Sequence, residues 1–247
     1  MRRRRTRVRD SYSEDVLWDT IETYNIVAGV YRRRPWGIVE KAMASDTIVF
    51  ADMGCGPGHN TIYLLQQHPG TKAVLIDLSK EMVRIGYRRA CRKKLSYRVL
   101  PLVADLRELP LRDNSLDSLI YIASLHHIPL REGRARALRE AYRVLRRGGR
   151  ILITVWARWQ LYFLLRLVVN AVKKIINPGR PVGDVVVYWR HHGIKLRRYY
   201  YLYTLSELVE EVVKTGFKII EKGVYRPSLK RSITKPLKNY YVLGIKE

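Results

Sequence analysis

Short apolar runs predict buried strands in this chain, and they alternate with segments in which apolar residues recur every three or four positions. Strands are expected at residues 47–50, 73–77, 97–104, 116–123 and 150–156. Strands that alternate with helices in this way predict a parallel sheet covered by helices on both faces. Because ligands of such sheets bind beyond the carboxyl ends of the strands, we expect the functional residues at those ends.

Helices and further strands are expected around this central pattern. Residues 131–145 predict a helix with one apolar face, and Gly148-Gly149 follow it as a stop signal. Residues 11–43 predict mostly helix, residues 205–222 a helix followed by a strand, and residues 239–246 a final strand.

Two segments differ from the rest in composition. Residues 1–10 are rich in arginine and predict a basic mobile tail, which either touches phosphate or only improves solubility. Residues 157–204 combine aromatic and basic side chains, and they predict a substrate-side insertion in a single domain that covers 11–247. The insertion contains an apolar stretch at 161–172 that is too short for a membrane span. It is expected to form a lid helix over the site, with a membrane surface or a partner protein as alternative contacts.

A glycine-rich turn follows the first strand and is the most specific local signal. Residues 52–58 read DMGCGPG, and a helical pattern comes directly after them. Glycines there let the backbone approach a ligand closely, and Asp77 at the end of the next strand can accept hydrogen bonds from two ribose hydroxyls. The acidic Asp52 suits a cationic ligand better than a pyrophosphate. The alternative interpretation is a turn whose glycines serve only the close packing of strand and helix.

The pattern D-x-G-C-G-x-G resembles motif I of the class I S-adenosylmethionine (SAM) methyltransferases. The resemblance implies SAM as cofactor and a Rossmann-like α/β fold, with a mostly parallel seven-stranded sheet flanked by helices. It also implies that Asp105, after the third strand, bonds the adenine amine. The cofactor-binding residues expected are Tyr24, Tyr31, Asp52, Gly54, Cys55, Gly56, Gly58, Asp77, Leu78, Asp105, Leu106 and Ala123. Tyr24 and Tyr31 are equally compatible with ordinary core packing.

Three further blocks resemble a narrower family. They are the segment from Tyr24 to Trp36, the segment YIASLHH at 121–127 with the helix after it, and Gly148-Gly149 followed by VWA at 155–157. Together they are similar to the tRNA wobble-uridine carboxymethyl methyltransferases, which include the methyltransferase domain of AlkB-homologue proteins and its fungal counterpart. The similarity covers most of residues 20–215. Two segments depart from the family pattern: residues 187–189, which read Val-Tyr-Trp instead of Val-Pro-Trp, and the basic stretch 230–239.

This narrower resemblance implies methyl transfer from SAM to the carboxylate of 5-carboxymethyluridine in the tRNA anticodon, which gives a methyl ester. A carboxylate is already ionised at neutral pH, so the reaction needs positioning and cationic partners rather than a strong base. Arg34, His127 and Arg134 are the candidate catalytic residues that would hold the carboxylate. Each also has a structural interpretation: Arg34 as a helix cap, one of His126 and His127 as a packing residue, and Arg134 as a solvated helix residue.

The insertion supplies residue types that bind an unstacked anticodon loop. Aromatic rings can stack on bases, and neighbouring arginines can take phosphates. The candidate substrate and RNA contacts are His126, Trp156, Arg158, Arg190, Arg197 and Arg198. Since an alternating strand would bury about half of residues 199–203, part of the aromatic side chains is expected to build the core instead.

The charge of the chain favours a polyanionic partner such as tRNA. Its 47 Lys and Arg residues exceed 22 Asp and Glu residues, which gives a formal net charge of +25. Attraction to nucleic acid is the expected consequence, whereas the charged networks of a thermophile would require more balanced numbers. Two cysteines argue against a disulfide scaffold or a cysteine-based zinc site, and no metal is expected. No secretory signal pattern is visible, so a cytoplasmic location is expected.

Two other functions compete with the tRNA methyltransferase interpretation. A methyltransferase of a small acid or phenol would explain the glycine turn but not the charge. A non-catalytic RNA-binding module would explain the charge but not the three aspartates Asp52, Asp77 and Asp105. The family resemblance also implies a small zinc-binding activator subunit that pairs with an exposed sheet edge, and no membrane partner.

Overall fold

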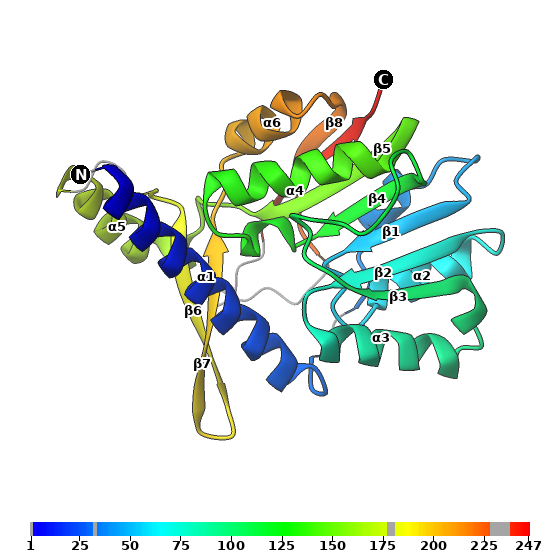
Figure 1. Cartoon of the computed structure of the whole chain (residues 1–247), viewed down its shortest axis with the longest axis horizontal. Coiled ribbons are helices and arrows are strands. Elements are labelled where there is room, and N and C mark those ends of the chain that lie inside the picture. Colours follow the sequence, from blue (N-terminus) through cyan, green and yellow to red (C-terminus); the bar gives the residue numbers. More distant parts are fainter. Residues whose placement is uncertain (1, 32–33, 177–180, 228–237) are drawn as a thin grey trace.

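The computed structural model describes residues 2–31, 34–176, 181–227 and 238–247. A seven-stranded sheet with the order β3-β2-β1-β4-β5-β9-β8 forms the centre of the molecule (Figure 1). Its strands are β1 (Val49–Met53), β2 (Lys72–Asp77), β3 (Val99–Val103), β4 (Leu116–Ile122), β5 (Leu145–Trp156), β8 (Lys218–Tyr225) and β9 (Asn239–Ile245). The first five strands are parallel, and β9 is antiparallel to both of its neighbours. The expected mostly parallel seven-stranded sheet is therefore confirmed.

Helices cover both faces of this sheet, because successive side chains of a strand point to opposite sides. In β1, Ala51 and Met53 pack in one cluster with α4 (Arg131–Val144) and α6 (Leu205–Lys214). Phe50 points the other way, into a cluster with η1 (Gly37–Ala42), α2 (His59–Gln67) and α3 (Lys80–Arg92). A short η2 (Ser96–Arg98) leads from α3 into β3.

The glycine stop expected after the helix at 131–145 is wrong. α4 ends at Val144 and β5 begins directly at Leu145, because the backbone of Leu145 pairs with Leu116 of β4. Gly148 has a φ of 75° and lies within β5. Strand pairing therefore ends this helix before the glycines are reached.

The amino-terminal region forms one long helix, α1 (Arg2–Val27). Residues 2–10, expected to be a mobile tail, form its first turns, in keeping with the high helix propensity of arginine. The second half of α1 lies along β7 (Ile194–Tyr201). The Oγ1 of Thr20 accepts a bond from the Tyr199 N–H at 3.0 Å, and the Oγ1 of Thr23 donates to the Arg197 carbonyl at 2.7 Å.

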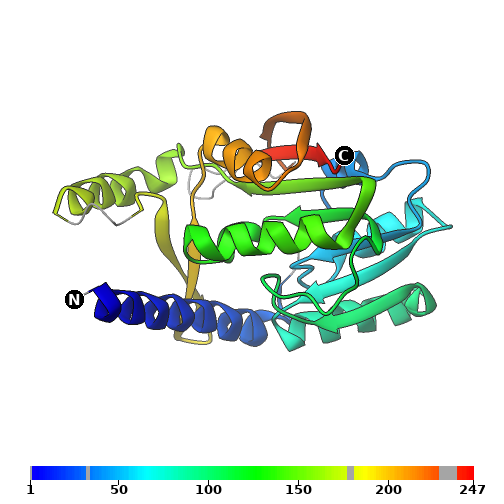
Figure 2. The ribbon, with the colours of Figure 1, turned by 45° about the horizontal axis from the view of Figure 1, so that its top comes forward.

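The insertion consists of η4 (Leu161–Phe163), α5 (Leu164–Ile176), β6 (Asp184–His191) and β7. β6 and β7 pair as an antiparallel hairpin whose turn residues His192 and Gly193 both have positive φ, as a tight hairpin turn requires. Figures 1 and 2 show α1, α5 and the hairpin together at one end of the molecule. Within the described part of the chain, no helix is both long and apolar enough to cross a membrane. Most of the basic stretch 230–239 lies outside the described residues.

Candidate active site

A cavity opens at the carboxyl ends of β1, β2 and β4, where the parallel topology predicts a ligand site. Among the residues expected from the sequence, those that line it are Tyr24, Tyr31, Arg34, Gly54, Cys55, Gly56, Asp77, Leu78, Asp105, Leu106, Ala123, His126, His127 and Trp156. Those that do not line it are Asp52, Gly58, Arg134, Arg158, Arg190, Arg197 and Arg198. None of the described side chains of α5 reaches the cavity, so the expected lid helix is wrong; α1 borders the cavity instead.

The glycine turn between β1 and α2 is shaped by two close neighbours. Gly54 has a φ of 77°, and a Cβ on it would lie 2.4 Å from the Cβ of Ser124. A Cβ on Gly58 would lie 3.2 Å from the Cα of Gly86 in α3. Gly54 therefore keeps the turn close to the end of β4 at the cavity, whereas Gly58 serves the packing of α2 on α3.

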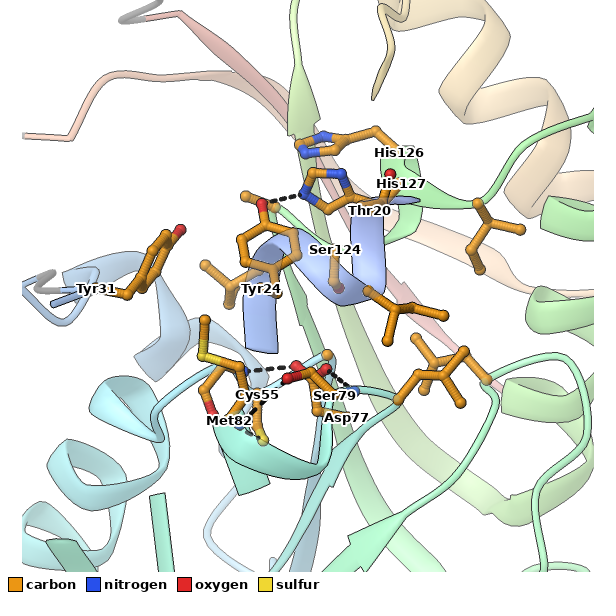
Figure 3. A pocket seen from close by; sticks show the side chains of 18 of the residues that line it. Thr20, Tyr24, Tyr31, Cys55, Asp77, Ser79, Met82, Ser124, His126 and His127 are labelled. Atoms are coloured by element: carbon orange, nitrogen blue, oxygen red, sulfur yellow. Dashed lines mark hydrogen bonds between the residues drawn. The ribbon is translucent and has the colours of Figure 1, made fainter. Parts of the chain in front are cut away.

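Asp77 is held at the cavity by two backbone donors. The Gly56 N–H donates to Oδ2 and the Ser79 N–H donates to Oδ1, each at 2.9 Å (Figure 3). Burial raises the pKa of Asp77, while these two bonds act in the opposite direction. A carboxylate has about four acceptor positions, so Asp77 retains the capacity to accept bonds from ligand hydroxyls.

Asp52 lies outside the cavity lining and is almost fully buried. The Thr61 Oγ1 donates to its Oδ2 at 2.6 Å, and its Oδ1 has no hydrogen-bond partner among the described residues. Burial raises the pKa of Asp52 to about 7. A buried carboxyl group in this state favours positive charge in a nearby ligand.

Asp105 lines the cavity but is already engaged by Arg107. The Nη2 of Arg107 lies 2.7 Å from its Oδ2, and the Nη1 of Arg107 lies 3.2 Å from Glu14 of α1. A bond from Asp105 to an adenine amine therefore requires a free lone pair on this carboxylate or a shift of the arginine.

These residues fit SAM, the cofactor that the sequence motif implies. Asp77 offers acceptors to a ribose, and the buried carboxyl of Asp52 favours the positive charge of a methionine ammonium and a sulfonium. The rings of Tyr24 and Tyr31 meet edge to face with centroids 5.7 Å apart, and both line the cavity. Aromatic rings in this position can interact favourably with a cationic group.

Tyr24, His127 and the backbone of β7 form a hydrogen-bonded chain, and Figure 3 shows its bond between Tyr24 and His127. His127 belongs to η3 (Leu125–His127); its Nδ1 lies 2.8 Å from the Tyr199 carbonyl and its Nε2 lies 2.9 Å from the Tyr24 hydroxyl. Because a carbonyl only accepts, Nδ1 carries the proton and the Tyr24 hydroxyl donates to Nε2. Burial lowers the pKa of His127 to about 3. The expectation that His127 holds a carboxylate as a cation is therefore wrong, because it is neutral and orients Tyr24.

His126 is fully buried beside His127. Its Nδ1 accepts a hydrogen bond from the Trp156 N–H at 3.0 Å, and burial lowers the pKa of His126 well below its usual range. The Trp156 ring stacks on Tyr200 with centroids 4.0 Å apart, and both rings contact His126. We call Tyr24, His126, His127, Trp156 and Tyr200 the aromatic end of the cavity.

Two of the expected arginines have structural roles instead. Arg134 is buried, pairs with Glu211 at 3.2 Å, and places its guanidinium carbon 3.8 Å from the centre of the Tyr201 ring. Arg158 is buried and pairs with Glu207 at 2.6 Å. Arg134 is therefore not a carboxylate-holding residue and Arg158 is not an RNA contact, because tertiary packing places their charges in the interior against glutamates.

The remaining expected arginines differ in exposure. Arg34 lines the cavity and is exposed, and Arg190 is exposed on the hairpin. Arg197 is partly engaged by Asp19 of α1, at 2.7 Å. Arg198 is buried behind the aromatic end of the cavity, so its expected contact with RNA phosphate is wrong.

Leu17, Thr20, Ile21 and Tyr200 are among the residues of the cavity that sequence reasoning missed. A signal for the first three existed in the spacing of Tyr24 and Tyr31, which lie seven residues apart. The same helical face continues backwards to residues 20, 21 and 17. Tyr200 had no such signal, because its position depends on how the hairpin packs against η3.

The fold and this site define the class of protein. The fold is that of class I SAM-dependent methyltransferases, and the sequence pattern of the methyltransferase domain family matches residues 51–153, which supports SAM-dependent methyl transfer. A SAM-dependent methyltransferase structure from Methanosarcina mazei superposes with a TM-score of 0.70 at 20% identity, covering 87% of this chain and 99% of that one.

Several relatives are more specific in name. The mouse tRNA (carboxymethyluridine(34)-5-O)-methyltransferase ALKBH8 is 36% identical over 57% of this chain, but the match spans only 20% of the mouse protein. The human probable tRNA methyltransferase 9B is 35% identical over 45% of the chain and 22% of its own length. A protein of Encephalitozoon cuniculi with a provisional methyltransferase name is 29% identical over 80% of this chain and 85% of its own length.

Proposed function

We propose that this enzyme methylates the carboxylate of 5-carboxymethyluridine, at the wobble position of a tRNA anticodon, to a methyl ester. The observation that carries the proposal is a single cavity with two chemically different ends. One end offers Asp77 to the cofactor, and the other is the aromatic end, suited to a flat nucleobase. The partial similarity to proteins named as tRNA methyltransferases supports RNA as the substrate.

The protonation states at the aromatic end favour a carboxylate over a phenol or an amine as methyl acceptor. Burial lowers the pKa of both histidines and raises that of the Tyr24 hydroxyl well above its usual range, so none of these groups is a good base at neutral pH. A phenol or an ammonium would have to lose a proton before it could attack. A carboxylate with an ordinary pKa is already ionised.

Bound SAM supplies an electrophilic methyl group. The carboxylate oxygen of the acceptor would form the new bond to this methyl carbon as the carbon–sulfur bond breaks, with the electron pair of that bond left on sulfur. The residues of the chain contribute position: the stacked rings of Trp156 and Tyr200 limit where the base can lie, and the bond from Tyr24 to His127 fixes the tyrosine. Such positioning can supply on the order of 7–11 kcal/mol of barrier lowering.

The exposed face of the hairpin is the proposed contact for the anticodon stem and loop. Arg190 and Lys195 are both exposed and lie opposite each other on the two strands of the hairpin. The ammonium of Lys195 lies 4.1 Å from the centre of the exposed Tyr188 ring. Basic side chains interleaved with an aromatic ring suit phosphates next to an unstacked base.

The edge strand β3 is the proposed surface for a small zinc-binding activator subunit. β3 pairs only with β2 within the described sheet. Tyr97, Leu100 and Val103, at or next to this edge, are 80%, 56% and 49% exposed. Exposed apolar side chains on an open edge are a liability that a partner strand would remove.

The first test uses labelled SAM and bulk tRNA from a strain that lacks this gene, with and without a candidate activator subunit. Nucleosides from the digested tRNA are then identified by mass spectrometry. Label in the methyl ester of 5-carboxymethyluridine is the expected result. Label in a different nucleoside would retain the RNA methyltransferase but exclude the carboxylate acceptor, and SAM binding without any labelled RNA would favour a small-molecule acid.

A further inference from the structure

His126 presents a buried hydrogen-bond donor that the protein itself does not use. Its Nδ1 accepts from the Trp156 N–H, so the proton of the neutral ring is on Nε2. This Nε2 is buried and has no hydrogen-bond partner among the described residues. The residue lines the cavity, so a ligand atom is the available acceptor. The fixed tautomer means that this acceptor must be an oxygen or nitrogen with a free lone pair.

Arg198 presents a buried charge without a carboxylate partner. It is 8% exposed, and neither an ion pair nor a bond to its Nε is found within the described part of the chain. Arg134 and Arg158, buried in the same region, each have a glutamate. The guanidinium of Arg198 bonds to the Tyr24 hydroxyl, but no carboxylate balances its charge. Leaving a buried charge without a counterion is costly, which points to an anion that belongs to the ligand.

Both groups border the same ring. The guanidinium carbon of Arg198 lies 5.5 Å from the centre of the Tyr200 ring, and the His126 ring lies 5.2 Å from it. Arg198 also lies 5.0 Å from the centre of the Trp189 ring. Burial acts against its charge, but Tyr200 and Tyr24 raise the pKa of Arg198, so it remains a cation. Burial is the main cause of the lowered pKa of both histidines, and the charge of Arg198 contributes in the same direction.

We propose that the aromatic end is a built site for the carboxylate of the methyl acceptor, in which the Nε2–H of His126 donates to a carboxylate oxygen and Arg198 is the counterion. The proposal rests on the proposed function and assigns to these two residues what the sequence assigned to Arg134 and His127. Arg198 does not line the cavity, so it is a positioning residue that acts through the wall formed by Tyr24 and Tyr200.

This arrangement discriminates between substrate and product. The acceptor carries one negative charge, and its methyl ester carries none. Esterification therefore removes the anion that balances Arg198 and leaves a weaker acceptor for His126. We expect the enzyme to bind the acid at least about tenfold more tightly than the ester or the uncharged amide, since a charged partner is lost in both.

The test measures the affinity of anticodon stem-loop RNAs that carry the carboxymethyl group, its amide or its methyl ester, without SAM so that no turnover occurs. Arg198→Met removes the charge and keeps the length, Arg198→Lys keeps the charge, and Arg197→Met is the control on the same strand. His126→Asn keeps an acceptor for the Trp156 N–H but lacks the Nε2–H donor.

The acid-over-amide preference should fall to about onefold in Arg198→Met, fall severalfold in His126→Asn, survive in part in Arg198→Lys and stay unchanged in Arg197→Met. A wild-type protein without the preference, or an Arg198→Met variant that retains it, would overturn the proposal. The affinities of the three RNAs for the wild type are compared first. That comparison tests the proposal even if a variant fails to fold. SAM affinity reports folding of each variant.

A second probe separates this proposal from the proposed function. Acetate and acetamide are compared for thermal stabilisation of the wild type and of Arg198→Met at matched chloride concentration. The carboxylate site is supported if acetate stabilises the wild type, acetamide does not, and the effect of acetate is lost in Arg198→Met. This holds even if no RNA is methylated. If RNA is methylated but acetate has no effect and the acid is not preferred over the amide, the proposed function stands and this assignment is wrong.

Discussion

Asp52 shows how burial changes the chemistry of one side chain. The pKa of its carboxyl group is about 7 in the folded chain against an ordinary 3.8, because burial disfavours the charged form. Between these two values the folded protein holds a proton that the unfolded chain has lost. Because of Asp52, the free energy of unfolding therefore falls as the pH rises through this window.

We expect Asp52→Asn to lose this pH dependence. Near about pH 4 the variant and the wild type should have similar stability, and near about pH 8 the variant should be more stable, by on the order of a few kcal/mol. Asparagine keeps an oxygen for the hydroxyl of Thr61, so the bond at 2.6 Å can persist. Thermal melts across this pH range measure the difference in stability. If the melting temperatures of the two proteins changed in parallel with pH, the explanation would be wrong.

The hydroxyl of Tyr24 can be tested separately from its ring. Tyr24→Phe removes the donor to the Nε2 of His127 and leaves that buried nitrogen unsatisfied, at a cost of about 1–3 kcal/mol. We expect kcat to fall about 10- to 100-fold, with SAM affinity nearly unchanged because the ring remains. Single-turnover kinetics and calorimetry measure the two quantities. Tyr188→Phe, at an exposed hairpin position, is the matched control, and wild-type turnover in Tyr24→Phe would exclude a role for the hydroxyl.

At the scale of elements, side chains of α1 hold this helix to the β6–β7 hairpin. β7 pairs with β6 on one side, and on the other side Thr20 and Thr23 bond to its backbone. Because α1 also carries Tyr24, these two threonines couple the position of the hairpin to that of a tyrosine that lines the cavity. The helix thus acts as the connection between cavity and insertion.

Replacement of both threonines by valine should loosen this contact. Each lost bond is expected to cost about 1–3 kcal/mol, and the amide of Tyr199 should exchange with solvent much faster, since its acceptor is Thr20. Hydrogen exchange and thermal melts measure both effects. Thr215→Val, at the end of α6, removes a similar hydroxyl bond and should leave exchange at Tyr199 unchanged. Unaltered exchange in the double variant would show that packing alone holds α1.

At the scale of the whole molecule, the net charge of +25 matters less than where the cations are exposed. Arg134, Arg158 and Arg198 are interior, so they cannot contact the backbone of a nucleic acid. Arg190 and Lys195 on the hairpin can. Charge reversal is therefore informative on the hairpin, whereas the same change at Arg198 would destabilise the fold.

We expect Arg190→Glu with Lys195→Glu to weaken tRNA binding at least about tenfold and to make it less sensitive to salt, because phosphate contacts release counterions. SAM affinity should not change. Arg92→Glu with Lys93→Glu, exposed at the end of α3 away from the hairpin in Figure 1, changes the net charge equally. Gel shifts over a salt series compare the three proteins. Equal weakening by both double variants would mean that only overall charge attracts tRNA.

Local signals were sufficient for the sheet and for the cofactor half of the site. Apolar runs placed β1, β2 and β4, and the glycine turn with Asp77 placed the ligand at their carboxyl ends, because each of these features depends on residues close together in the chain. Helix limits were less predictable: α4 ends at Val144 since β5 begins to pair there, which no residue of α4 itself signals.

By itself, then, the sequence determined the class of fold, because strand order translates directly into position, and the resemblance of its glycine turn to a known motif indicated the cofactor. The strand ends at which the cofactor binds stay a prediction. Only the tertiary structure decided which cations are buried against glutamates and which are not. A charged side chain looks the same in any segment, and its role depends on burial and on the partner it meets. Arg134 forms an ion pair with Glu211 in the interior and is structural. Arg198 lies against the rings of Trp189 and Tyr200 and has no carboxylate partner among the described residues, which is why we assign its charge to a ligand.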